Sequence, residues 1–96
     1  MFGRIVRLEV EPEKVDPGIE WIKSTAMPRA QAQAGFKRGY WFFDRPTGKA
    51  AVVTLWDSEG SLKDSAQLAA DLREESIQVL GTGVLTVEEY ELAADA

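Results

Sequence analysis

The residues of this chain that could carry chemistry are few in kind. Its 96 residues include no histidine and no cysteine, and the sequence contains no asparagine. Without histidine or cysteine, neither a Ser–His or Cys–His nucleophile pair nor the usual zinc, copper, haem and iron–sulfur ligations can be assembled. No stretch has the aspartate spacing of a calcium- or magnesium-binding loop. We therefore expect no metal and no cofactor, so any chemistry falls to aromatic rings, hydroxyl groups and guanidinium groups.

Three aromatic side chains and three arginines are the candidates for a site. A tryptophan ring can stack on a flat ligand, a tyrosine hydroxyl can donate a hydrogen bond to an oxyanion, and a guanidinium can hold a carboxylate or an enolate. The candidate catalytic residues are Trp56, Tyr40 and Tyr90, and the candidate ligand-binding residues are Arg4, Arg7 and Arg38. A core tryptophan, half-buried sheet tyrosines and solvated or cross-strand charges explain the same residues without a site, and this structural interpretation is favoured for each.

An aromatic β-hairpin over residues 39–56 is the element that positions several of these side chains. Four consecutive aromatic residues at 40–43 precede a turn in which Pro46 and Gly48 supply the required backbone angles. Successive strand side chains point to opposite faces, so two of these rings lie on each face of the sheet. The return strand is apolar on both parities as well. A sheet that needed only one covered face would alternate apolar and polar residues, so both faces must be covered.

The segment before the hairpin predicts a strand at residues 2–10, followed by a helix. Asp16 is expected to be the N-cap of this helix, with Pro17 at its first helical position. Pro28 should kink the helix or split it just after Met27. Gly35 can take the left-handed conformation that ends it.

The segment after the hairpin predicts a second helix and a last strand. Asp57 or Ser58 can cap this helix, its apolar residues recur at helical spacing, and Gly81 ends it. Residues 84–92 then read as a strand, with Val84, Tyr90 and Leu92 expected on one face.

The order of these elements is β-α-β-β-α-β, so we predict a single α+β domain over residues 1–96 with the ferredoxin-like arrangement. Right-handed crossovers place both helices on one face of a four-stranded antiparallel sheet and leave the other face bare. An apolar bare face is an exposed patch of a kind that monomers rarely tolerate. We therefore expect a homodimer that forms through the open sheet face.

Charge and hydropathy bear on partners and location. The net charge of −5 and the pI of about 4.7 disfavour binding to nucleic acid. No apolar run approaches the ~20 residues of a membrane span, and arginines interrupt the apolar residues at the N-terminus where a signal peptide would need a core. We expect a cytoplasmic protein with no membrane and no nucleic-acid partner.

Four motifs are spread along the chain: Gly35-Phe36 after a helix with an internal proline, Asp44-x-x-Thr47-Gly48-Lys49 in the turn, Val53-Thr54-Leu55-Trp56-Asp57-Ser58-Glu59 at the strand-to-helix junction, and Val87-x-x-Tyr90-Glu91 near the end. Together they resemble the dimeric α+β barrel superfamily and, within it, the antibiotic biosynthesis monooxygenase group. The resemblance covers nearly the whole chain. It implies the fold and dimer expected above more strongly than it implies a function.

The resemblance also implies which activities to weigh. The haem-degrading branch uses a first-strand asparagine, a tryptophan that Trp56 matches, and a histidine where this chain has Ala66. The asparagine of the polyketide-oxidising branch is also absent, so neither haem chemistry nor that branch's hydrogen-bonding pattern is supported. What remains is a cofactor-independent monooxygenase that acts on a phenol or quinol, in a pocket between the sheet and the helices of one subunit. The alternatives are a non-catalytic module that binds a small aromatic or apolar molecule, and a structural or interaction homodimer.

Overall fold

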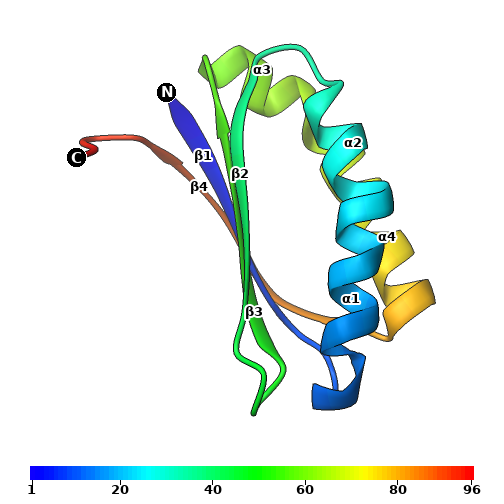
Figure 1. The fold of residues 1–96 in the computed structure, drawn as a ribbon. Helices are drawn as coiled ribbons and strands as arrows, with labels where there is room; N and C mark the ends of the chain where they lie inside the picture. Colours follow the sequence, from blue (N-terminus) through cyan, green and yellow to red (C-terminus); the bar gives the residue numbers. More distant parts are fainter.

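A computed structural model describes all 96 residues as one sheet with helices on one side. The four antiparallel strands are β1 (Phe2–Glu9), β2 (Phe36–Phe43), β3 (Lys49–Trp56) and β4 (Gly83–Glu91), in the spatial order β2-β3-β1-β4. All the helices lie on one face of this sheet and the other face is bare (Figure 1). The predicted α+β class and ferredoxin-like order are confirmed.

The hairpin of β2 and β3 carries aromatic residues on both faces, as its sequence predicts. Strand pairing sets Trp41 opposite Val52 and Phe43 opposite Ala50, on the face that the helices cover. Tyr40 and Phe42 point to the open face, where they stack with ring centroids 6.3 Å apart. Their side chains are 43% and 58% exposed, so the open face of this chain presents large rings to solvent.

The first helical segment begins earlier than predicted, and it continues through Pro28 without the split that was one of the two alternatives there. A 3-10 turn at Pro12–Lys14 runs directly into α1 (Val15–Trp21), so the helical path begins before Asp16 and Asp16 is not an N-cap. Pro28 does not split the helix either. A π-helical turn at Ile22–Ala26, in which the Met27 N–H donates to the Ile22 carbonyl, leads into α2 (Met27–Gln31). The wider turn accommodates a proline ring that would clash with the carbonyl four residues earlier.

The second helical segment is two helices rather than the one that was predicted. Ser58 caps α3 (Glu59–Asp64) by accepting from the Ser61 N–H at 3.1 Å, and α4 (Ala66–Leu80) ends at Gly81, whose φ is +66°. The break falls at Ser65, whose hydroxyl donates to the Leu62 carbonyl at 2.6 Å. That carbonyl is thereby withdrawn from regular helical bonding. None of the helices combines the length and the apolar composition that a bilayer span requires.

The last strand contains a β-bulge that the sequence pattern did not predict. Its pairing with β1 shifts by one residue, so that Leu8 lies opposite Val84 while Arg7 lies opposite Thr86. Val84 therefore packs against the core beside Leu8, whereas Tyr90 lies on the open face. The expectation that Val84 and Tyr90 share a face is wrong, because one extra residue reverses the alternation of side chains.

Candidate functional site

A cavity of about 110 Å³ lies between the covered face of the sheet and the helices, and it is partly open to solvent. Of its 21 lining residues, 15 are hydrophobic. All three tryptophans of the chain contribute to its wall: Trp21 from α1, Trp41 from β2 and Trp56 from β3. Small residues of the two helical segments, such as Ala26 and Ala69, also line it. Alanine side chains leave space that larger residues would fill, so the alanines help to keep the cavity open.

Trp56 is the predicted candidate that lies most firmly in this wall. Its side chain is 2% exposed, and its indole N–H donates to the Thr54 hydroxyl at 3.1 Å. Phe36 contacts it edge to face, with ring centroids 5.4 Å apart. Since its one polar group is already paired within β3, Trp56 offers the cavity an apolar ring rather than a hydrogen-bond donor.

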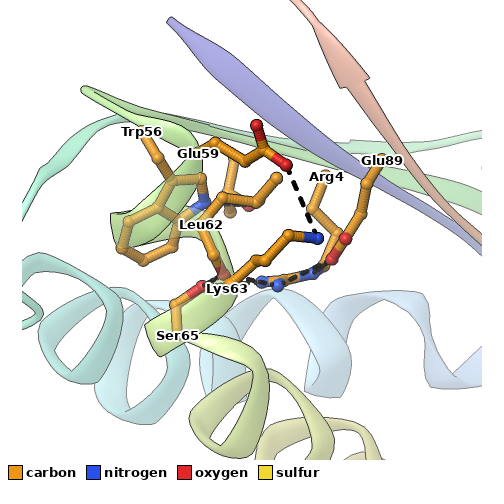
Figure 2. A network of polar contacts seen from close by, with 8 residues as sticks. Arg4, Trp56, Glu59, Leu62, Lys63, Ser65 and Glu89 are labelled. Carbon is orange, nitrogen blue, oxygen red and sulfur yellow. Dashed lines mark hydrogen bonds and ion pairs between the residues drawn. The ribbon is translucent and has the colours of Figure 1, made fainter.

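Arg4 also lines the cavity, but its guanidinium is occupied by the protein (Figure 2). Nε and Nη2 donate to one carboxylate oxygen of Glu89 at 3.0 and 2.9 Å. Nη1 donates to the Ser65 hydroxyl and Nη2 to the Leu62 carbonyl, each at 2.9 Å. The side chain is 4% exposed, so these bonds tie β1 to β4 and to the break between α3 and α4. Arg4 is therefore held as a structural link, with most of its donors used.

Arg73 of α4 is a site residue that the sequence reasoning did not single out. It lines the same cavity, and its buried Nη1 has no hydrogen-bond partner. Burial lowers the pKa of Arg73, the charge of Arg4 lowers it further, and Glu89 opposes the change. The guanidinium nevertheless stays protonated. The sequence could have indicated Arg73, because it is a charged residue among the apolar positions of the second predicted helix, where apolar side chains are expected.

The other four predicted residues lie on the open face, across the sheet from the cavity. Arg38 and Tyr40 of β2 pair opposite Leu55 and Val53, whose side chains share that face. The Tyr90 hydroxyl donates to Glu88 Oε1 at 2.8 Å, which raises the pKa of Tyr90 and lowers that of Glu88.

Arg7 approaches the same Glu88 carboxylate at 3.5 Å. Of the six candidates, the structure brings only Trp56 and Arg4 together at the cavity, because the other four have the opposite strand parity.

No group of three or more histidine, cysteine, aspartate or glutamate side chains gathers as a metal site would require. Among the cavity-lining side chains, the only ionisable ones are Arg4 and Arg73. The chemistry available to the cavity is therefore enclosure of an apolar group, ring stacking and the pairing of a negative charge.

Comparison with known proteins gives relatives of undetermined function. No protein-family model matches the chain. Two uncharacterized proteins of Mycobacterium tuberculosis (strain ATCC 25618 / H37Rv), Rv2557 and Rv2558, are 24% and 29% identical to it over 98% and 94% of its length. The chain spans only about two-fifths of the length of these curated relatives, 42% and 39% respectively.

Solved structures are similar over nearly the whole chain. The NE2512 protein of unknown function from Nitrosomonas europaea has a TM-score of 0.76 and 23% identity, with 99% of this chain and 91% of that one covered. A monooxygenase from the gene ActVA-Orf6 of Streptomyces coelicolor, in complex with nanaomycin D, has a TM-score of 0.75 and 15% identity over 99% and 89%. A dimeric ferredoxin-like protein from an uncultured marine organism has a TM-score of 0.74 and 9% identity over 100% and 98%. The chain therefore has the ferredoxin-like fold.

Proposed function

We propose that this protein binds a small aromatic or apolar molecule in the cavity between the sheet and the helices. The observation that carries the proposal is the cavity itself, which is walled by three tryptophans and is predominantly apolar. An apolar recess with a few polar groups is the usual form of a small-molecule site.

The size of the cavity limits what it can hold without rearrangement. Its volume of about 110 Å³ is somewhat below the ~150 Å³ at which an engineered apolar cavity in another protein binds benzene. A single aromatic ring is thus the natural unit, and a larger ligand requires the partly open side or a shift of the helices.

Catalysis is the second candidate function, and the fold neighbour that is a monooxygenase supports it. In this version the protein oxidises a phenol or quinol-type substrate without a cofactor. For an anthrone, the methylene carbon becomes a carbonyl, one atom of O₂ enters the product and the other leaves as water. The substrate supplies all four electrons, so the chain would only bind it, stabilise its anion and exclude water. In this version Trp56, which lines the cavity, is the proposed catalytic residue that contacts the substrate.

We also propose that the chain is a homodimer joined through its open sheet face. Tyr40, Phe42 and Tyr90 are 43%, 58% and 54% exposed on this face in the single chain. A second copy related by a two-fold axis would cover all three rings on both chains at once. In this arrangement Tyr40, Tyr90, Arg7 and Arg38 serve assembly rather than catalysis.

Calorimetric titration with phenol tests binding at the cavity. Ala69→Phe places a ring where the cavity wall is small, and Ala70→Phe adds the same ring at the exposed neighbouring position. We expect phenol to bind the wild type and Ala70→Phe, and to bind Ala69→Phe much more weakly. Equal binding to all three would place the phenol elsewhere and overturn the proposal.

Oxygen uptake with a panel of hydroquinones and anthrones, with and without Trp56→Phe, tests the catalytic version. Rates equal to buffer across the panel would exclude this reaction for those substrates while leaving ligand binding intact.

A further inference from the structure

We propose that the ligand of this cavity is an acid, with an aromatic or apolar body and one carboxylate or phenolate that pairs with Arg73. The inference rests on the proposed function and adds the chemical class of the ligand. It follows from the buried side-chain nitrogen and oxygen atoms, among which only Arg73 Nη1 has no hydrogen-bond partner.

The hydroxyl groups of the wall, and the other arginine, have hydrogen-bond partners within the protein. Thr54 accepts from the Trp56 indole, Ser65 pairs with Arg4 and the Leu62 carbonyl, and the Ser76 and Thr82 hydroxyls lie 2.8 Å apart. Arg73 Nη1 alone is buried without a partner. A buried donor without an acceptor costs free energy, and more so when it is charged. A bound acceptor would remove that cost.

The charge of the site points to an anion rather than to a neutral acceptor. Arg4 has its own counter-ion in Glu89, whereas Arg73 forms no ion pair. No aspartate or glutamate lines the cavity. The wall therefore carries an uncompensated positive charge, although the chain as a whole has a net charge of −5.

The position of Arg73 in an apolar wall strengthens its effect on a ligand. Charge-assisted hydrogen bonds are roughly twice as strong as those between neutral groups, and a planar guanidinium can offer two parallel donors to a carboxylate. The same charge stabilises a phenolate over its phenol, because a nearby positive charge lowers the pKa of an acid. A molecule with one ring and one acidic group fits both the volume and the charge.

Two matched single-ring probes, benzoate and its neutral analogue benzamide, test the inference by calorimetric titration. We expect the wild type to bind benzoate about ten-fold or more tightly than benzamide, in line with a charge-assisted contact. Arg73→Met should abolish this preference by weakening benzoate binding far more than benzamide binding, while Arg73→Lys should retain part of the preference. Arg7→Met, which removes a cation from the opposite face, should behave as the wild type.

4-Nitrophenol gives a second readout, since its phenolate is coloured. Its pKa when bound should be lower in the wild type than in Arg73→Met, in which only the apolar wall remains. Binding of phenol and benzamide without any preference for benzoate would overturn the acid inference and leave the proposed function standing. Failure of all these probes to bind would overturn both.

Discussion

Replacing Arg4 by methionine should substantially lower the free energy of unfolding of this domain, because the Arg4 side chain links separate elements of the fold. Arg4→Met keeps an unbranched apolar stem and deletes all the donors that join β1, β4 and the break after α3. The Leu62 carbonyl and the Ser65 hydroxyl each lose a charged donor in a buried place, at about 1.5 kcal/mol each. The pair with Glu89 adds at most about 1 kcal/mol, because that carboxylate is 36% exposed. The Ser65–Leu62 bond survives and offsets part of the loss.

The expected sum is a loss of about 3 kcal/mol in the free energy of unfolding, or a Tm lower by roughly 12–24 °C for a domain of this size. Denaturant and thermal unfolding followed by circular dichroism measure it. Arg7→Met is the matched control, since it lies on the same strand, faces the other way and has a 59% exposed side chain. It should lose less than about 1 kcal/mol. Arg73→Met should be neutral or stabilising, because it removes a partly buried guanidinium whose Nη1 has no partner. A loss for Arg4→Met within about 0.5 kcal/mol of that for Arg7→Met would refute the structural role of Arg4.

Two further predictions concern the open face. Phe42→Glu should dissociate the proposed dimer by placing like charges on two facing sheets. Sedimentation at micromolar concentration should then give the mass of one chain for this variant, and twice that mass for the wild type and for the control Gln78→Glu on α4. A monomeric wild type would contradict the prediction. The Tyr90–Glu88 hydrogen bond predicts a pH dependence at both extremes. The pKa of Tyr90 is raised above 10.0, so the contribution of Tyr90 to the stability of the folded state is complete below pH 10.0. That contribution is lost as the pH rises through the pKa that Tyr90 has in the folded state. The pKa of Glu88 is lowered below 4.5, so the contribution of Glu88 to the stability of the folded state is present above pH 4.5. That contribution is lost as the pH falls through the pKa that Glu88 has in the folded state. Tyr90→Phe should flatten the profile of Tm against pH in both windows, and an unchanged profile would count against the pair.

The sequence pattern predicted the fold well because its main signals were local. The alternation of aromatic residues in the hairpin, the glycines at 35, 48 and 81 and the cap at Ser58 all act over a few residues, and the structure has them in place. What the pattern missed depends on contacts between distant segments. At the break between α3 and α4, Ser65 accepts a hydrogen bond from Arg4, which lies 61 positions earlier in the chain. The bulge that places Val84 and Tyr90 on opposite faces is defined only by the pairing of β4 with β1.

The candidate site was less predictable for the same reason. Residue type alone favoured tyrosines and arginines, but the strand parity of each decides whether it faces the cavity or the open face. Arg4 and Arg73 show that the sequence also does not reveal which charged side chains are paired. Both are arginines in the cavity wall, and only the position of Glu89 reveals that one is paired and the other is free.

Diffraction from a crystal soaked in iodobenzene would show whether the cavity accepts an aromatic ring, because the anomalous signal of iodine locates the ring. We predict an iodine peak in the cavity among Trp21, Trp41 and Trp56. Iodine peaks only on the open sheet face, with none in the cavity at saturating iodobenzene, would contradict it.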